Sequence, residues 1–530
     1  MSFKITVIGA GSIGFTRTLM HDVLNVPEFA ADPKLEICFH DVSARNLDMV
    51  YRLMERDIKE NHLPTKLTKS LNRRAAVSGA RYVINTTRIG GLEAFATDVE
   101  IPLKYGVDQC VGDTLCAGGI MYGQRNVPAI LDFCRDIREV AEKNALFLNY
   151  ANPNAMNTWA ALQYGGVRTL GLCHGVEGGH WQIASAIEHY INKGKKKGDK
   201  GYREIDHRRD VDIVCAGINH QTWYVHVLFD GEDWANDPRL LQAFATHPEY
   251  SKTEKVRIDM LRRFGYYSTE SNGHLSEYVP WYRKRPADIK RWIDLGCWIN
   301  GETGGYLRVC TEGRNWFETD FPNWLKEKAP VLGGAGTRSH EHGSYIIEAL
   351  ETGRVYRGHF NFRNDGCIAN LPADAIVEAP AYVDHNGISV PRVGDLPLGC
   401  AAVCQNSINV QRLAVEAAVR ADVTLLKQAM MLDPLVGAVC DPREISQMTD
   451  EMLIAGAKWL PQYASQMAAI KKRFASEEKL GTRKTAGAAR LHTKTVAEMR
   501  KDKQAQAMAR KADKGNPDAA QVGKAGKKGK

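Results

Sequence analysis

The sequence predicts an α/β protein: a Rossmann-type parallel sheet domain followed by an α+β domain. Over the first 175 residues, short apolar strands alternate with helical patterns, which is typical of a parallel sheet covered by helices. After about Gly178 this alternation stops, and residues 211–460 mix short strands, aromatic-rich loops and one long helical stretch. We therefore expect a first domain over 1–178, a second over 179–470 and a tail over 471–530.

The elements of the first domain can be placed in order from their apolar patterns and caps, such as the N-cap candidate Ser43. The predicted strands are Lys4–Gly9, Leu35–Asp41, Tyr82–Thr86, Leu146–Tyr150 and Thr169–Cys173. The predicted helices are Ile13–Leu24, Ser43–Glu60, Val127–Glu142 and Ala155–Gln163. In the second domain we expect a strand over Val211–Ala216 and a long helix over about Asn406–Met430.

Composition excludes several classes of protein. The chain has 530 residues, of which 44% are hydrophobic and 25% charged, which is ordinary for a globular protein. It has no run of about 18 apolar residues, so we expect no membrane span. The 12 cysteines form no CxxC pair, and the N-terminus enters a strand without an export signal. We therefore expect reduced thiols and a cytoplasmic protein.

The basic charge of the chain belongs to its tail. Residues 471–530 hold 18 Lys and Arg against 6 Asp and Glu, whereas the whole chain has a net charge of only +8. The body is therefore slightly acidic, and we expect no nucleic-acid binding by it. We expect the tail to be disordered, because it holds too few apolar residues to bury; binding to an RNA or an anionic surface is the alternative for this segment.

A glycine-rich turn follows the first strand. Gly9, Gly11 and Gly14 form a G-x-G-x-x-G motif that also contains Ser12 and opens a helix. Gly9 permits the tight turn, Gly11 lets a diphosphate approach the backbone, and Gly14 permits close helix packing. Asp41, at the end of the second strand, is placed to accept from a ribose hydroxyl, which favours NAD over NADP. A merely structural glycine turn is the alternative.

Polar residues follow the ends of two further strands. Asn149 and Asn152-Pro153 could offer amides to a nicotinamide ribose or a sugar, or could simply cap the next helix. Cys173-His174 ends one predicted strand, and Asn219-His220 lies near the end of another. A thiolate and an imidazole can hold a divalent metal, although a lone Cys or His is more often a core residue.

Three polar stretches could carry proton transfer or substrate binding. The stretch 269–278 contains His274, Glu277 and Tyr278, which can all move protons. Asp113-Thr114 is followed by two glycines and by Arg125, and the segment 361–372 is similarly rich in Asn and Asp. Each could also be ordinary turn chemistry.

Together these motifs resemble glycoside hydrolase family 4, the NAD- and metal-dependent glycosidases, over about residues 3–465. Within that family the sequence looks most like the α-galactosidase (melibiase-type) branch, through Asn157-Thr158-Trp159, Cys173-His174 and the stretch 269–278. The motifs that carry the resemblance are Gly9–Gly14, Arg88-Ile89-Gly90-Gly91, Asp113-Thr114, Gly118-Gly119-Ile120, Asn149, Asn152-Pro153, Cys173-His174, Gly217-Ile218-Asn219-His220, Asn364-Asp365-Gly366, Asn370-Leu371-Pro372, Ile408-Asn409-Val410-Gln411 and Trp459-Leu460-Pro461.

The resemblance implies a two-domain fold similar to lactate and malate dehydrogenases, and a mechanism without net redox. NAD⁺ takes hydride from C3 of the sugar, which acidifies the C2 proton. A base removes that proton, the C1–O bond breaks by elimination, water adds and the hydride returns. A divalent metal such as Mn²⁺ stabilises the enediolate as a Lewis acid.

The resemblance also implies roles for particular residues. Cys173 and His220 match the family's metal ligands. His174 stands where some relatives carry an acidic aspartate, so the group that protonates the leaving group stays open. Tyr278 and His274 are both candidates for the C2 base, with Tyr278 preferred. The cofactor residues are expected to be Gly9, Gly11, Ser12, Gly14, Asp41 and Asn149, and the substrate residues Asn152, Arg88, Asp113 and Asn219.

Alternatives remain for the substrate and the reaction. α-Galactosides are expected, but α-galacturonides, α-glucuronides or other acidic sugars stay open, since Arg88 and Arg125 could meet a carboxylate. A simple NAD-dependent 2-hydroxy acid dehydrogenase is the second alternative. A small glycoside is the expected partner molecule, and a homodimer or homotetramer the expected assembly.

Overall fold

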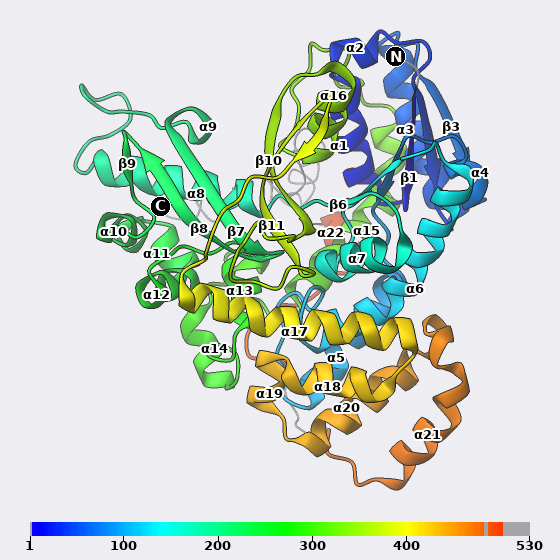
Figure 1. Ribbon diagram of the computed structural model, residues 1–530, viewed down its shortest axis with the longest axis vertical. Helices are drawn as coiled ribbons and strands as arrows, with labels where there is room; N and C mark the ends of the chain where they lie inside the picture. Colours follow the sequence, from blue (N-terminus) through cyan, green and yellow to red (C-terminus); the bar gives the residue numbers. More distant parts are fainter. Residues whose placement is uncertain (1–2, 482–485, 502–530) are drawn as a thin grey trace.

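One mixed β-sheet runs through the molecule (Figure 1). The protein is described by a computed structural model over residues 3–481 and 486–501. The strands lie in the order β3-β2-β1-β4-β5-β6-β10-β11-β7-β8-β9, with β12 beside β11. Their bounds are β1 Lys4–Ile8, β2 Glu36–His40, β3 Lys66–Ser70, β4 Tyr82–Asn85, β5 Leu146–Asn149, β6 Thr169–Gly171, β7 Val211–Ile218, β8 Gln221–Phe229, β9 Glu232–Asp233, β10 Tyr356–Arg363, β11 Ile376–Asp384 and β12 Gly387–Ser389.

The first six strands are parallel and have the Rossmann order. The order reverses between β1 and β4, so a crevice forms outside the carboxyl ends of these strands, where ligands bind in such sheets. The predicted parallel sheet is confirmed.

The antiparallel strands continue the same sheet. Strand β10 pairs with β6 where Asn361 lies opposite Gly171, and β11 then leads to the β7–β8 hairpin. The expected α+β part is thus confirmed as a fold class. The boundary predicted at residue 178 falls inside helix α8 (Gly175–Ile191), and the two predicted units share one sheet.

Helices cover both faces of the sheet, and a helical layer lies beneath α17, the long yellow helix of Figure 1. In the first half the helices are α1 Ile13–Leu24, α2 Pro27–Ala30, α3 Ala44–Glu60, α4 Arg73–Val77, α5 Gly91–Lys104, α6 Cys116–Val140, α7 Asn154–Ala160 and α8. The later ones are α9 His207–Asp210, α10 Pro238–Thr246, α11 Tyr250–Thr253, α12 Lys255–Phe264, α13 Asn272–Tyr278, α14 Pro286–Trp292, α15 Gly305–Trp324, α16 His342–Thr352, α17 Leu398–Arg420, α18 Val423–Leu432, α19 Pro434–Val439, α20 Pro442–Ala455, α21 Met467–Ser476 and α22 Val496–Lys501.

Two hydrophobic cores hold these layers together. The larger one runs from the parallel strands through α6 and α17 to α20. The smaller one lies between the β7–β8 hairpin and the helices α8, α10 and α12.

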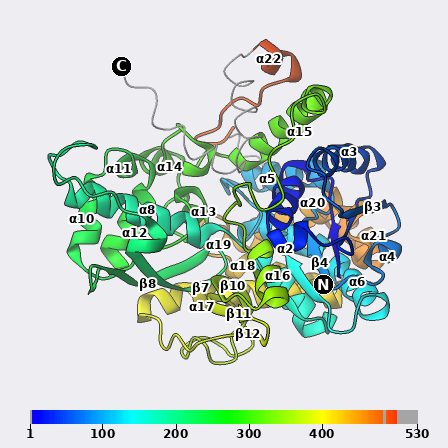
Figure 2. The same ribbon diagram turned by 90° about the horizontal axis from the view of Figure 1, so that it is seen from above.

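Part of the basic tail is folded onto the body, so the prediction of a wholly disordered tail is wrong for residues 471–481 and 486–501. Helix α21 begins before residue 471, and α22 packs against α15 (Figure 2). Met499 is buried, and the backbone N–H of Ala488 donates to Asp108 at 2.9 Å. The composition hid these few anchoring contacts. Residues 482–485 and 502–530 lie outside the described part.

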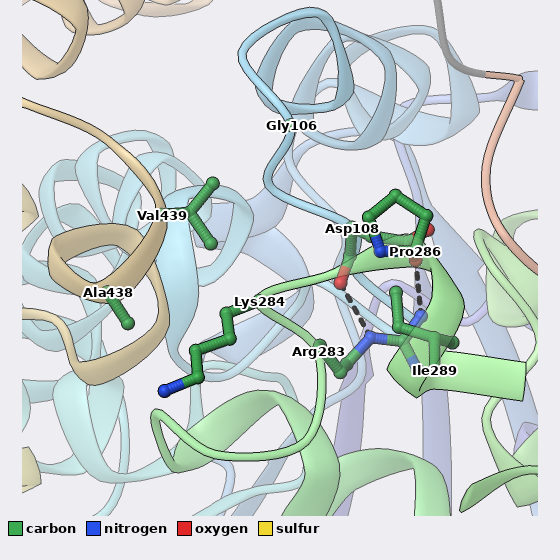
Figure 3. A pocket seen from close by; sticks show the side chains of 8 residues that line it. All are labelled: Gly106, Asp108, Arg283, Lys284, Pro286, Ile289, Ala438 and Val439. Atoms are coloured by element: carbon green, nitrogen blue, oxygen red, sulfur yellow. Dashed lines mark hydrogen bonds and ion pairs between the residues drawn. The ribbon is translucent and has the colours of Figure 1, made fainter. Parts of the chain in front are cut away.

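Asp108 is a junction between the tail and the body. Its carboxylate also pairs with Arg283 and accepts the hydroxyl of Thr303 at 2.8 Å. It lines a cavity of about 320 Å³, together with residues of α14 and α19 (Figure 3). Of the charged groups drawn there, Arg283 and Asp108 are bonded to each other.

Candidate active site

The glycine-rich turn joins β1 to α1 at the carboxyl edge of the parallel strands. Gly9 has a φ of 86°, and a Cβ on it would lie 2.9 Å from the backbone of Thr86. A Cβ on Gly11 would lie 2.6 Å from Oδ2 of Asp41. The Asp41 carboxylate accepts the backbone N–H of Gly11 at 2.8 Å and of Ser43 at 2.7 Å. The turn and the acidic residue therefore form one surface, as a dinucleotide site requires.

Ser12 and Gly14 are exposed at the start of α1. Ser12 is the N-cap residue, and its side chain makes no capping bond. The first-turn N–H groups are therefore free to meet an anion such as a diphosphate. We expected Gly14 to permit close packing of α1; its exposure corrects this reason, because the missing side chain keeps the helix start open instead.

Asn149 ends β5 and is buried. Its Oδ1 accepts from Asn85 at 2.8 Å, and its Nδ2 donates to the carbonyl of Ala151 at 3.0 Å. In this arrangement the amide joins the ends of β4 and β5. Its contact with the cofactor stays a prediction.

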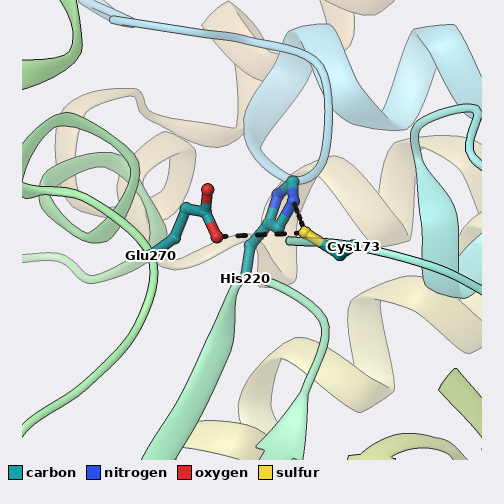
Figure 4. A group of neighbouring side chains, drawn as sticks. All are labelled: Cys173, His220 and Glu270. Carbon is teal, nitrogen blue, oxygen red and sulfur yellow. Dashed lines mark hydrogen bonds between the residues drawn. The ribbon is translucent and has the colours of Figure 1, made fainter. Parts of the chain in front are cut away.

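Cys173, His220 and Glu270 bring a sulfur, an imidazole nitrogen and a carboxylate together (Figure 4). Cys173 follows β6, His220 lies in the β7–β8 turn, and Glu270 precedes α13. Sγ of Cys173 is 3.2 Å from Nε2 of His220 and 3.9 Å from Oε2 of Glu270. All three ligand atoms lie within 4.8 Å of one another, so one ion could contact them all.

The hydroxyl of Thr114 fixes the orientation of the His220 ring, on the side of the ring away from Cys173. The Thr114 hydroxyl donates its one proton to the Asp113 carboxylate at 3.0 Å, and it lies 2.9 Å from Nδ1 of His220. Because that proton is committed to Asp113, the Thr114 oxygen accepts the Nδ1–H of His220. The lone pair of Nε2 then faces Cys173, which is the tautomer that a metal ligand needs.

The chemistry of this donor set fits a divalent transition metal. Sulfur, imidazole and carboxylate ligands suit such ions and leave positions open for substrate oxygens. Burial raises the pKa of the Cys173 thiol well above its usual range. A cation beside the sulfur would reverse this effect, because a coordinating thiol is held deprotonated.

Glu270 was not predicted from the sequence as a member of this metal-ligand set, which is called the centre below. The residue lies in the polar stretch 269–278, so the signal was present, but nothing in the spacing connected it to Cys173. A Cβ on Gly175 would lie 1.6 Å from Oε2 of Glu270. A glycine at the first position of α8 is therefore what lets this carboxylate reach the sulfur.

His274 and Tyr278 lie on α13 and are both buried. The His274 ring is 5.0 Å from that of His220, and its Nδ1 is 2.7 Å from the Ser271 hydroxyl. Burial lowers the pKa of His274 to about 4. Burial raises the pKa of Tyr278 well above its usual range, and its hydroxyl has no hydrogen-bond partner among the described residues.

Glu277 supports a loop, which corrects the view of it as a candidate proton carrier. Its carboxylate accepts the backbone N–H groups of Cys110, Val111 and Gly112 at 2.6, 3.1 and 3.0 Å. Burial raises its pKa to about 7. Glu277 therefore holds the loop that presents Asp113.

The structure brings three of the predicted substrate residues together. Oδ2 of Asp113 accepts from Nδ2 of Asn152 at 3.1 Å and from Arg88 at 3.4 Å. The Arg88 guanidinium lies over the rings of Phe95 and Tyr122, with its carbon 4.3 and 4.9 Å from their centroids. These aromatic rings and Asp113 fix Arg88 in place.

The fourth predicted substrate residue, Asn219, lies deeper. It is fully buried, and its Nδ2 donates to Glu378 of β11 at 3.1 Å. Burial raises the pKa of Glu378 to about 8. The Oδ1 of Asn219 has no partner among the described residues, so this one atom is available to a ligand or water.

His174 lies beside the centre but faces away from the core. Its side chain is 40% exposed, and its Nδ1 is 3.3 Å from the carboxylate of Glu341. No sequence motif pointed to Glu341, which reaches the site from the start of α16.

The fold and this geometry define a Rossmann-type protein with a metal-ligand set at the carboxyl edge of its sheet. Family models match residues 4–189, described as family 4 glycosyl hydrolase, and residues 215–436, described as the family 4 glycosyl hydrolase C-terminal domain. The chain belongs to glycosyl hydrolase family 4, which confirms the resemblance.

Similar proteins have been characterised in bacteria. An α-galactosidase of Rhizobium meliloti (strain 1021) is 56% identical over 95% of this chain and 98% of its own. An α-galactosidase of Bacillus subtilis (strain 168) is 32% identical over 87% of this chain and 99% of its own. The 6-phospho-β-glucosidase of Thermotoga maritima, solved with manganese, NAD⁺ and glucose-6-phosphate, has the same fold, with 22% identity and a TM-score of 0.67 over 86% of this chain and 99% of its own.

Membership of this family makes the chain a glycoside-hydrolysing enzyme and disfavours the 2-hydroxy acid dehydrogenase alternative. Within the described part of the chain, no helix combines the length and apolar character needed to cross a membrane.

Proposed function

We propose that this protein is an α-galactosidase that depends on NAD⁺ and a divalent metal such as Mn²⁺. The 56% identity to an α-galactosidase over 95% of the chain supports the substrate. The convergence of Cys173, His220 and Glu270, with Cys173 after β6 of the sheet whose strand β1 leads into the dinucleotide turn, is the observation that carries the mechanism. Identity to α-galacturonidases is only 26%, so the galactoside is favoured over the uronide alternative.

The chain's residues fit both groups that the reaction needs. When bound, NAD⁺ supplies a reversible hydride acceptor and the metal a Lewis acid. Gly9, Gly11 and the start of α1 would hold the diphosphate, with Asp41 at a ribose. Cys173 and His220 would hold the metal, as expected, and Glu270 is added here as a third donor.

Proton transfer is assigned to side chains next to the metal-ligand set. Tyr278 is our candidate for the C2 base, because its buried hydroxyl has no partner among the described residues and is left for the substrate. His274 is the second candidate, since its lowered pKa leaves it neutral, although its Nδ1 is engaged with Ser271. His174 is the candidate group for the leaving-group oxygen.

The sugar substrate is assigned to the polar side chains near the metal-ligand set. Asn152, Arg88 and Asp113 form a bonded group that could contact sugar hydroxyls, and Asn219 contributes one open oxygen. Charge-assisted bonds of this kind orient a polar ligand well.

The test is a panel of p-nitrophenyl α- and β-glycosides and glycosiduronates, assayed with NAD⁺, Mn²⁺ and thiol. We expect cleavage of the α-galactoside, no net NADH, and a slower reaction when C2 carries deuterium. Dialysis against a chelator, or removal of NAD, should abolish the activity. Full activity in a sample stripped of both would contradict the mechanism, and accumulation of NADH would favour the dehydrogenase.

Three further expectations complete the proposal. We propose a cytoplasmic enzyme that forms a homodimer or homotetramer in solution. Light scattering after gel filtration measures the assembly. Nucleic-acid binding is not proposed for the body; a gel-shift assay with and without residues 502–530 would test it for the tail.

A further inference from the structure

Glu341 is a buried carboxylate without hydrogen bonds. The residue is 1% exposed, and neither of its carboxylate oxygens has a hydrogen-bond partner among the described residues. It is the N-cap residue of α16, but its side chain does not cap the helix. Nδ1 of His174 lies 3.3 Å from Oε1 of Glu341.

Contacts of the two residues that follow Glu341 fix this segment beside Cys173 and Tyr150. The next residue, His342, approaches the carbonyl of Cys173 to 3.0 Å through Nε2. The N–H of Gly343 donates to the hydroxyl of Tyr150 at 2.8 Å, at the end of β5. The Glu341 carboxylate thus lies next to His174 and close to the segment that carries the metal ligand Cys173.

A buried carboxylate whose oxygens accept no hydrogen bond is costly unless a ligand supplies the donors, and the contact with the partly exposed His174 supplies none. Sugar hydroxyl groups are suitable donors, and bonds to an ionised acceptor are about twice as strong as neutral ones. A carboxylate or phosphate on the sugar would instead meet a like charge at Glu341, which is unfavourable.

We propose that Glu341 is a specificity-determining residue that accepts hydroxyl groups of a neutral galactoside and excludes sugars carrying an anion. The inference rests on the proposed function, because it assigns the substrate class of the same site. Glu341 is not among the four substrate residues expected from the sequence.

Binding to the holoenzyme tests this without turnover. With NAD⁺ and Mn²⁺ present, calorimetry compares galactose and galacturonate on the wild type and on Glu341→Gln. We expect galactose to bind better to the wild type, and the substitution to weaken galactose by about 10-fold. Galacturonate binding should stay equal or improve, so the ratio between the sugars narrows, while the Kd for NAD⁺ is unchanged.

Glu351→Gln is the matched control. It removes the same charge from the other end of α16, where Glu351 pairs with Arg81 and Tyr82. We expect it to leave the sugar ratio unchanged. Equal loss of both sugars in Glu341→Gln, a change confined to NAD⁺, or no galactose binding by the wild type would overturn the inference.

The outcomes separate the two levels of the argument. If the wild type binds galactose with the expected preference but does not cleave p-nitrophenyl α-galactoside, the proposed function fails and the assignment of Glu341 stands. If it cleaves the galactoside but Glu341→Gln keeps the ratio, only the assignment fails.

Discussion

At the scale of single residues, the metal-ligand set of Cys173, His220 and Glu270 depends on the absence of a side chain at Gly175. A side chain at this position would occupy the place of the Glu270 carboxylate, since the two would be 1.6 Å apart. The smallest residue in the site therefore determines whether its acidic group can approach Cys173.

Gly175→Ala should displace Glu270 and lower activity by about 100-fold, because an error of about 1 Å in a reacting site can have such an effect. Steady-state kinetics and Mn²⁺ titration measure the change. Gly178→Ala is the control, since a Cβ there has nothing within 4 Å, and it should behave as wild type. Equal activity of the two variants would contradict this account.

Thr114→Val should weaken metal binding by about 10- to 100-fold, because the hydroxyl that fixes the tautomer of His220 is lost. Isothermal titration with Mn²⁺ measures the effect. Thr114→Ser keeps the hydroxyl and should restore most of the affinity. If Val and Ser bind metal alike, the hydroxyl does not orient His220.

The residues of the centre were only partly predictable. Cys173 and His220 could be proposed because each ends a strand and matches a family motif. Glu270 and Glu341 could not, since their role depends on which loops meet in space. Glu277 was misjudged because a carboxyl that binds backbone N–H groups looks, in sequence, like one that moves protons.

At the scale of elements, α13 carries both chemistry and support. One face presents His274 and Tyr278, while Glu277 bonds three consecutive N–H groups of another loop. The position of Asp113 thus depends on this short helix, although the two are far apart in the chain.

Glu277→Gln should destabilise the protein by about 2–4 kcal/mol, because the amide group of Gln cannot accept all three N–H groups and leaves donors unpaired. Chemical denaturation measures the free energy of unfolding. Glu93→Gln, the same change on an exposed side chain, should alter it by less than about 0.5 kcal/mol. Equal stability of the two variants would show that the loop does not need Glu277.

Several elements differ from their predicted bounds for local reasons. The long helix expected over Asn406–Met430 is two helices, because Ala421 has a φ of 54° and Asp422 caps α18. Helix α6 begins at Cys116 and includes Gly118 and Gly119, which the sequence pattern placed in a loop. A Cβ on Gly119 would lie 2.4 Å from the Thr114 backbone, so close packing explains that glycine.

At the scale of the whole molecule, the described part of the tail packs against the body and contributes to its stability. Truncation after Gly481 should lower the unfolding temperature by several degrees, because buried Met499 alone contributes about 1.5–3 kcal/mol. Truncation after Lys501 keeps the described contacts and should unfold as the full chain does. Scanning calorimetry compares them; equal temperatures for all three would mean that the docked segment adds no stability.

The continuous sheet limits how the enzyme can take up its sugar. The parallel strands and the antiparallel strands belong to one sheet, in which β6 pairs with β10 where Gly171 lies opposite Asn361. Rotation of the two parts about a hinge would break that pairing. We therefore expect side chains and loops to move when a galactoside enters and its products leave, while the strands of the sheet stay in place.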